Sequence, residues 1–193
     1  MRNILRLETG ERVPAIALVG SSGSGKTTLI EAVVPFLKAY GYRVGVVKHA
    51  HRGFEIDQPG KDSFRVRRAG AAQVLVGSNR QWALIGDEPP GAEDPQLAAL
   101  VARFSPGGID VVLAEGFSHE AVPKIEVFRP AHGRPPRCWP GDPAVVAVAS
   151  DADVPVEPPV VRLDLNRPES VAEFIADWAS SSRRPVVRPR SAR

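Results

Sequence analysis

Cysteine is nearly absent from this chain of 193 residues, which contains only Cys138. A single thiol cannot form an internal disulfide, and this fits a protein that folds in the reducing cytoplasm. Cys138 lies in a proline-rich stretch, where the sequence offers no obvious partner that would activate it as a nucleophile. We therefore expect a cytoplasmic protein that does not use cysteine chemistry.

Long hydrophobic runs are also missing. The chain has no run of about 18 apolar residues, which argues against a membrane-spanning helix. The N-terminal segment MRNILRLETGERVP lacks the apolar core of a secretory signal, so we expect no such signal here. Hydrophobic residues make up 43% and charged residues 24% of the chain, as in ordinary globular proteins. The length suits one domain, which we place at residues 1–180.

The excess of positive charge is confined to one end of the chain. The formal net charge is +3, but five arginines and no acidic residues lie within residues 181–193. The rest of the chain has 20 of the 25 basic residues and all 22 acidic residues, a net charge of −2. We therefore expect no nucleic-acid binding by the main body. Residues 181–193 are rich in serine, proline and arginine, which predicts a basic disordered tail. Such a tail either keeps the protein in solution or contacts an anionic partner.

Two kinds of apolar stretch alternate along the chain. Residues 15–19 form a short apolar run that predicts a buried strand. Helical spacing follows, with apolar residues at Leu29, Ile30, Val33, Val34 and Leu37. Pro35 should bend this helix, Gly41 should end it, and residues 43–48 predict the next strand. Together these segments predict a β-α-β unit with a right-handed crossover.

The rest of the sequence continues this alternation. Predicted strands are residues 73–78, 81–86, 110–115, 124–129 and 144–150, and predicted helices are residues 64–72, 95–104 and 168–179. Asn79 and Arg80 separate two of these strands and predict a turn. Strands that alternate with helices indicate an α/β fold with a mostly parallel sheet flanked by helices on both faces.

A glycine-rich loop lies between the first strand and the first helix, where Gly20–Thr27 is G-S-S-G-S-G-K-T. This matches the phosphate-binding P-loop (Walker A) pattern G-x-x-x-x-G-K-[ST], with the strand before it and the helix after it that the pattern requires. Glycines let successive backbone N–H groups converge on a phosphate at the helix N-terminus. We expect the nucleotide phosphates to be held by Ser22, Gly23, Ser24, Gly25, Lys26, Thr27 and Thr28.

Two side chains of this loop have distinct predicted roles. The Lys26 ammonium should reach the β- and γ-phosphates, and the Thr27 hydroxyl should bind Mg²⁺. A second acid is needed to position the metal or a water. Glu115 is the best candidate, because it ends a predicted buried strand and ligands bind at the carboxyl ends of such strands. We therefore predict Lys26 and Glu115 as the catalytic residues, and Thr27 and Glu115 as the metal site.

Polar residues after the second strand are weaker candidates. His49 and His51 are two residues apart and point the same way in an extended chain, but no third metal ligand has suitable spacing. A position near the phosphates or a substrate is the favoured interpretation of both histidines. Asp57 and Asp62 either belong to the magnesium site or, in the case of Asp62, cap the next helix.

Several stretches together resemble the molybdopterin-guanine dinucleotide biosynthesis protein B family (MobB). After the P-loop they are K-H-x-H from Lys48, D-x-P-G-K-D-S from Asp57, A-G-A from Ala69 and E-G-F from Glu115. The resemblance runs from about Ile16 to Arg129. It departs from the family at Arg52, where a second histidine is common.

The resemblance implies a P-loop NTPase fold with an added antiparallel strand region, weak GTPase activity and a homodimer. Its members assist a molybdenum cofactor guanylyltransferase that joins GMP from GTP to molybdopterin, so this chain would be an adaptor with GTP and Mg²⁺ as ligands. Lys48, His49, His51, Asp57 and Asp62 then become candidate substrate contacts. Hydrolysis is expected to be slow, because the sequence shows no evident arginine finger or glutamine, although a partner may supply one.

Guanine selectivity and the reaction class stay open. Asp151 follows the strand at residues 144–150, where it either accepts hydrogen bonds from guanine N1–H and N2–H or forms a simple turn. Two alternatives to the adaptor remain. One is a small-molecule kinase with its acceptor near His49 and His51, and the other is a metal-delivery GTPase that uses the same histidines.

Overall fold

The computed structural model describes residues 4–7, 10, 12–50, 54–88, 93–105 and 107–183. Its internal contacts divide the chain into two compact units. The larger unit consists of Met1–His49 with Pro95–Arg193, and the smaller unit consists of Ala50–Asp94. Each unit has its own β-sheet, and the larger one contains both the P-loop and Glu115.

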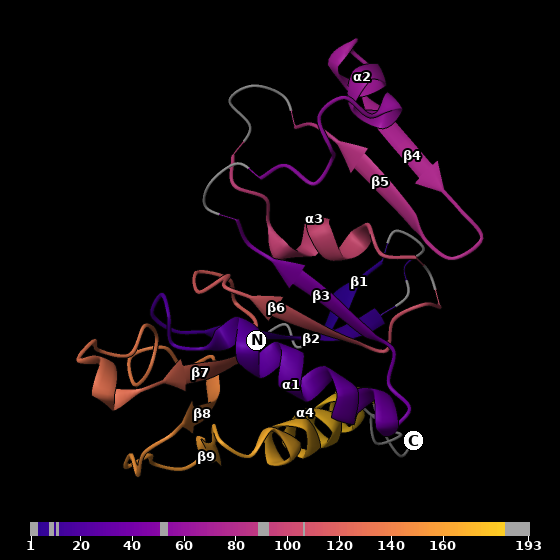
Figure 1. Ribbon diagram of the computed structural model, residues 1–193. Helices are drawn as coiled ribbons and strands as arrows, with labels where there is room; N and C mark the ends of the chain where they lie inside the picture. Colours follow the sequence, from indigo (N-terminus) through magenta and orange to yellow (C-terminus); the bar gives the residue numbers. More distant parts are fainter. Residues whose placement is uncertain are drawn as a thin grey trace, which may run out of the picture. The chain divides into compact units, whose positions relative to one another are not determined.

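A seven-stranded sheet forms the centre of the larger unit (Figure 1). Its strands are β1 (Ile4–Arg6), β2 (Arg12–Val19), β3 (Val44–Lys48), β6 (Val111–Glu115), β7 (Lys124–Phe128), β8 (Val145–Ser150) and β9 (Val161–Asp164). Strands β3-β6-β2-β7-β8-β9 lie side by side in that order and all run parallel. Strand β1 pairs antiparallel with the start of β2. The predicted α/β fold with a mostly parallel sheet is confirmed.

The sheet also differs from the sequence prediction. Strands β1 and β9 are not predicted from the sequence, because both are short and neither forms a continuous apolar run. Strand β6 lies between β2 and β3, so the first β-α-β unit passes over one strand position. The alternating stretch 124–129 does form a strand, but its polar residues Lys124 and Glu126 are buried rather than exposed.

Helices cover both faces of this sheet. They are α1 (Lys26–Ala39), α3 (Leu97–Ala102) and α4 (Pro168–Arg183), with a single 3₁₀ turn at Pro130–His132. Ile16 and Leu18 of β2 point into a hydrophobic cluster with residues of α1 and α4, which lie together on one face. Ala15 and Ala17 point into a second cluster with α3 and β1. Residues 13–19 of β2 are all apolar because alternate side chains face opposite, covered sides.

Helix α1 carries the predicted apolar residues on its buried face and continues through Pro35 to Ala39. Gly41 follows with φ +88°, in the left-handed region that favours glycine. The Gly41 N–H donates to the Lys38 carbonyl, and the Tyr42 N–H donates to the Leu37 carbonyl, each at 3.0 Å. This is the Schellman pattern of helix termination, and it confirms the predicted stop at Gly41.

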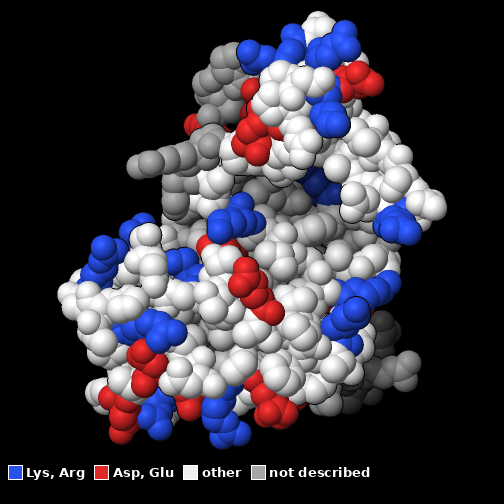
Figure 2. All heavy atoms as spheres, viewed as in Figure 1, with Lys and Arg blue, Asp and Glu red and all other residues white. Residues whose placement is uncertain are grey.

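The smaller unit contains α2 (Asp62–Arg68) and an antiparallel hairpin of β4 (Gln73–Gly77) and β5 (Trp82–Gly86). The predicted turn between these strands is confirmed, since the Ser78 N–H donates to the Gln81 carbonyl at 2.8 Å. The added antiparallel region is therefore present. Several large apolar side chains of this unit are more than half exposed, namely Phe54, Ile56, Val66, Leu75, Trp82 and Leu84. Figure 2 shows a broad uncharged surface over β4 and β5.

The C-terminal helix runs further than predicted. Helix α4 ends at Arg183, so it includes the first residues of the segment 181–193. Residues 184–193 lie outside the described part of the chain. Val171 and Ile175 of α4 are buried, and Phe174 and Trp178 pack against the same cluster, as the helical spacing predicts. Within the described residues, no helix combines the length and apolar character that crossing a bilayer requires.

Candidate functional site

The glycine-rich loop connects the carboxyl end of β2 to the start of α1, as predicted. Gly20 has φ +144°, and a Cβ atom on it would lie only 2.4 Å from the carbonyl oxygen of Val127 in β7. Gly25 is the N-cap of α1 and lies in the left-handed region, with φ 98° and ψ 19°. Glycine is therefore required at Gly20 by close packing and favoured at Gly25 by backbone conformation.

A cavity of about 330 Å³ opens at this loop. It is lined by Ser22, Gly23, Gly25, Lys26, Thr27, Thr28 and Glu115. The structure thus brings together six of the seven residues predicted to hold phosphates and the acid predicted to hold the metal. The seventh, Ser24, is buried, and its hydroxyl has no hydrogen-bond partner in the described part of the chain.

Lys26 bends back over the loop that precedes it. Its Nζ donates to the carbonyl oxygens of Gly20 and Ser21, at 3.0 and 2.9 Å. Partial burial lowers the pKa of Lys26, and the nearby Glu115 carboxylate opposes that shift. The ammonium is thus held by neutral carbonyls beside the cavity, which is where a phosphate would need it.

Glu115 meets Thr27 and Lys48 at the carboxyl ends of three neighbouring strands. The Thr27 hydroxyl lies 2.8 and 2.9 Å from the two carboxylate oxygens of Glu115. The Lys48 Nζ lies 3.2 Å from Glu115 Oε1 and 3.4 Å from Thr27 Oγ1. A hydroxyl and a carboxylate are oxygen donors of the kind that Mg²⁺ prefers. Thr27 and Glu115, the pair predicted to bind the metal, therefore fit a Mg²⁺ site in both chemistry and position.

His49 lies immediately after β3 and is mostly buried. Its N–H donates to the Glu115 carbonyl at 3.0 Å, and its ring centroid lies 5.2 Å from Phe117 and 6.1 Å from His119. The sequence offered no reason to group His119 with these residues. His51 lies outside the described residues, so its predicted position near the phosphates or a substrate is not tested. In the described ranges no cluster of three or more His, Cys, Asp or Glu residues could hold a metal.

Asp57 and Asp62 both belong to the smaller unit. Asp57 Oδ1 accepts hydrogen bonds from the Ser63 hydroxyl at 2.8 Å and from the Gln58 N–H at 3.0 Å, which ties the loop to the start of α2. Asp62 is the first residue of α2, and the N-cap position is Lys61. The alternative that Asp62 caps this helix is therefore wrong. Its exposed carboxylate pairs with Arg65 at 3.5 Å instead.

Asp151 follows β8 and pairs with Arg129 at 2.5 Å. Arg129 also donates through Nε to the carbonyl of Ser24 in the P-loop, at 3.1 Å. Asp151 lines a second cavity of about 520 Å³ at the carboxyl ends of β8 and β9, together with Asp153, Asp164 and Asn166. This volume lies within the usual range for small-molecule pockets.

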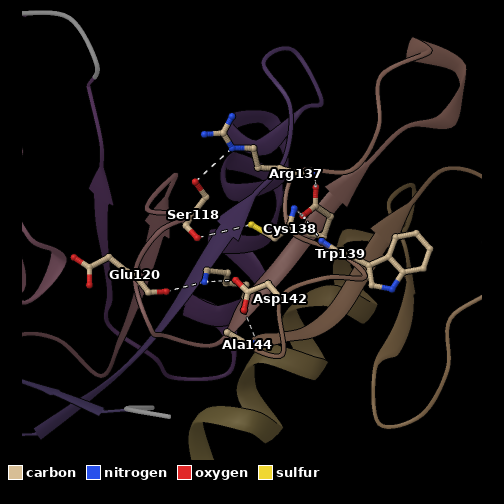
Figure 3. Close-up of polar contacts among 9 residues, drawn as sticks. Ser118, Glu120, Arg137, Cys138, Trp139, Asp142 and Ala144 are labelled. Atoms are coloured by element: carbon tan, nitrogen blue, oxygen red, sulfur yellow. Dashed lines mark hydrogen bonds and ion pairs between the residues drawn. The ribbon is translucent and has the colours of Figure 1, made fainter.

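Two buried charged residues of β7 hold the segment that follows it. Glu126 Oε1 accepts the Arg137 N–H at 2.6 Å, and Oε2 accepts the Cys138 N–H at 2.9 Å. Figure 3 shows Arg137, Cys138 and Asp142 of this segment. Lys124 donates to the Asp142 carboxylate at 2.6 Å and to the Glu120 carbonyl. Buried charges are tolerated when they are paired in this way. Their alternation along 124–129 was the only sequence signal of this role.

The same segment also contacts the glycine-rich loop. Arg134 Nη1 donates to the Ser22 carbonyl at 3.1 Å, and the Ser21 hydroxyl donates to the Pro135 carbonyl at 3.2 Å. The sequence of this segment predicts only a proline-rich loop. No local pattern indicates that an arginine of this loop lies beside the predicted phosphate site.

Comparison with known proteins identifies close relatives. The family model described as molybdopterin guanine dinucleotide synthesis protein B matches residues 15–151. The molybdopterin-guanine dinucleotide biosynthesis adapter protein of Escherichia coli K12 is 43% identical over 86% of this chain and 93% of that protein. The protein of the same name from Haemophilus influenzae is 38% identical over 86% of this chain and 90% of its own length.

Solved structures show the same fold. A crystal structure of molybdopterin-guanine biosynthesis protein B is 28% identical, with a TM-score of 0.60 over 84% of this chain and 98% of that one. Bacillus subtilis MobB is 21% identical, with a TM-score of 0.67 over 86% of this chain and 97% of that one. At that identity the second match supports the fold alone.

Proposed function

This chain belongs to the molybdopterin guanine dinucleotide synthesis protein B family, and on that basis we propose that it is an adaptor for the guanylylation of molybdopterin. The resemblance seen in the sequence motifs is thereby confirmed. In this role the chain binds GTP with Mg²⁺ and hydrolyses it slowly, beside a guanylyltransferase that performs the transfer. One observation carries the proposal: the residues predicted to bind phosphate line a cavity together with the Thr27–Glu115 pair.

The loop supplies two kinds of group for the triphosphate. The first N–H groups of α1 have no partner within the helix, and together with the loop N–H groups they favour a bound anion. The Lys26 ammonium, which now donates to the carbonyls of Gly20 and Ser21, would donate to the β- and γ-phosphates instead. Charge-assisted bonds to phosphate are stronger than bonds to neutral carbonyls, so this exchange favours nucleotide binding.

Thr27 and Glu115 are the residues that would hold Mg²⁺. When bound, the ion neutralises charge on the phosphates. Lys48 lies against both residues in this structure, so its ammonium would give up its contact with Glu115 to the ion. We assign Lys48 and the adjacent His49 to the surroundings of the terminal phosphate or of a substrate.

Slow hydrolysis follows from the composition of the cavity. In hydrolysis a water attacks the γ-phosphorus, the bond to the β–γ bridging oxygen breaks, and GDP and phosphate leave with one proton released. Among the described residues that line the cavity, Glu115 is the only carboxylate that could act as a base toward that water. The same carboxylate serves the metal, which leaves no dedicated base for the attacking water.

The cavity beside Asp151 is the proposed place for guanine. It lies at the carboxyl ends of β8 and β9, and Arg129 connects it to the P-loop through Ser24. In this interpretation the Asp151 carboxylate accepts from guanine while it remains paired with Arg129. Adenine presents no donor at the N1 position, so the carboxylate would select against ATP.

A homodimer and a cytoplasmic location complete the proposal. The smaller unit exposes the apolar side chains of Phe54, Ile56, Leu75, Trp82 and Leu84, and apolar patches of this kind usually mark an interface. We assign this surface to contacts with a second copy of the chain. The guanylyltransferase and molybdopterin would then bind near the nucleotide site. The cytoplasm is the compartment that supplies GTP.

A pull-down with the guanylyltransferase tests the adaptor role. The wild-type chain and the variants Lys26→Ala and Arg12→Ala are incubated with the enzyme, with and without GTP and Mg²⁺. Arg12 is exposed at the opposite end of β2 from the P-loop and serves as the matched control. We expect nucleotide-dependent capture by the wild type and the control, and loss of that dependence in Lys26→Ala. Absence of capture under every condition would contradict the adaptor role.

A further inference from the structure

We propose that Arg134 binds the γ-phosphate of the nucleotide in cis, and that the buried Glu126 positions it. The inference rests on the proposed binding of GTP at the P-loop. Arg134 is separated from Ser22 by 112 residues in the sequence, so only the folded chain shows the two together.

The position of Arg134 follows from its contacts with the loop. The Lys26 ammonium lies on the carbonyls of Gly20 and Ser21, and the Arg134 guanidinium lies on the next carbonyl, that of Ser22. The P-loop lysine is the group that reaches the β- and γ-phosphates. Ser22 itself lines the cavity, and Arg134 lies next to it, in a smaller hollow that Ser21 and Ser24 also line. A rotation of the Arg134 side chain past Ser22 would bring a second cation to the terminal phosphate.

Arg134 differs from Arg129, which also donates a hydrogen bond to a carbonyl of the P-loop. Arg129 is paired with Asp151 at 2.5 Å, so its charge is already balanced and it serves to brace Ser24. Arg134 is exposed and has no carboxylate partner in the part of the chain that the structure describes. Its present acceptor is a neutral carbonyl. A phosphate oxygen is a better acceptor for a guanidinium, so a bound γ-phosphate would draw Arg134 to itself.

Glu126 fixes the segment that carries Arg134. Its carboxylate is fully buried on β7 and accepts hydrogen bonds from the main-chain N–H groups of Arg137 and Cys138. Directly after Arg134, the Pro135 carbonyl accepts a hydrogen bond from the Ser21 hydroxyl of the loop. Anchoring close to the arginine reduces the conformational entropy lost when its side chain binds a phosphate. Glu126 is thus a positioning residue.

Discrimination between triphosphate and diphosphate is the property that Arg134 would control. The full chain is titrated calorimetrically with GDP and with a non-hydrolysable GTP analogue, in the presence of Mg²⁺. For Arg134→Ala we expect about tenfold weaker binding of the analogue, which is the usual size of a lost charged hydrogen bond, and about twofold or less for GDP. Arg134→Lys should recover part of the loss. Arg12→Ala, which also removes one exposed arginine, should change neither affinity.

The outcomes separate this inference from the proposed function. A wild-type chain that binds neither nucleotide overturns both. If the wild type binds both nucleotides and Arg134→Ala has the same ratio of analogue affinity to GDP affinity, only the role of Arg134 is overturned. This holds whether the variant binds both nucleotides as well as the wild type or binds both equally more weakly.

Glu126→Gln tests the positioning role, because glutamine keeps the shape and one carbonyl oxygen but loses the charge. We expect it to lower the analogue-to-GDP ratio in the same direction as Arg134→Ala. In the double variant the two effects should not add, since both act through one contact. A purely structural Glu126 would lower the unfolding temperature and leave the ratio unchanged, which would overturn the assignment.

Discussion

Replacing Gly20 by alanine tests whether the P-loop is packed against β7 as the structure has it. On the observed backbone the new Cβ would lie 2.4 Å from the Val127 carbonyl oxygen, whereas real Cβ atoms essentially never come closer than 3.0 Å. The loop and β7 would have to separate by about 0.6 Å (3.0 minus 2.4 Å). The matched control is Gly23→Ala, because Gly23 also has a positive φ, +81°, but no atom within 4 Å of its Cβ position.

The two variants share one cost and differ in another. A non-glycine residue in the left-handed region costs roughly 1–2 kcal/mol, and both variants bear this. Forcing extra atoms into a packed site costs roughly 1–3 kcal/mol more, and only Gly20→Ala bears that. A difference of about 2 kcal/mol corresponds to about 4–8 °C in the unfolding temperature of a chain of this size.

Thermal unfolding followed by circular dichroism measures this difference directly. We expect Gly20→Ala to unfold below Gly23→Ala by that interval, and both to unfold below the wild type. If Gly20→Ala were as stable as Gly23→Ala, the close approach of the loop to Val127 would be wrong, and the position of the cavity would have to be reconsidered.

Three further predictions concern single carboxylates. Glu115→Gln should reduce the gain in GTP affinity on adding Mg²⁺, measured by calorimetry with and without the ion; an undiminished gain would remove Glu115 from the metal site. Asp151→Ala should weaken GTP relative to ATP, whereas an equal loss for both nucleotides would remove its role in guanine selection. Burial alone would raise the pKa of Asp142, but the hydrogen bonds from Lys124 and from the Ala144 N–H, together with the Lys124 charge, outweigh it and hold the pKa below its usual value. The pair therefore stabilises the fold above about pH 4 and less as the pH falls. In urea unfolding at pH 7 and pH 3, the wild type should lose more stability than Asp142→Asn, and an equal loss would contradict this pairing.

The P-loop and its strand–helix context could be predicted because they are encoded locally. The backbone conformation of the loop needs glycines at fixed spacing, and Lys26 and Thr27 follow directly on the same chain. Glu115 could also be predicted, since the end of a buried parallel strand lies at the ligand-binding edge of the sheet. The structure places it against the Thr27 hydroxyl.

The surroundings of the loop could not be predicted, because they depend on contacts between distant parts of the chain. Alternating Lys124 and Glu126 normally indicates a half-exposed strand. Here each polar side chain is buried with partners from a later loop, which no local pattern announces. The approach of Arg134 to Ser22 depends on that anchoring, and so it was missed as well.

The most direct test of the central claim, that this loop grips a nucleoside triphosphate, is calorimetric titration of GTP with Mg²⁺ into the wild type and Lys26→Ala. Circular dichroism must show that both are folded. The account predicts saturable binding by the wild type and a loss of about 100-fold in the variant, since two charged hydrogen bonds to phosphate are removed. Unchanged GTP binding by folded Lys26→Ala would contradict it.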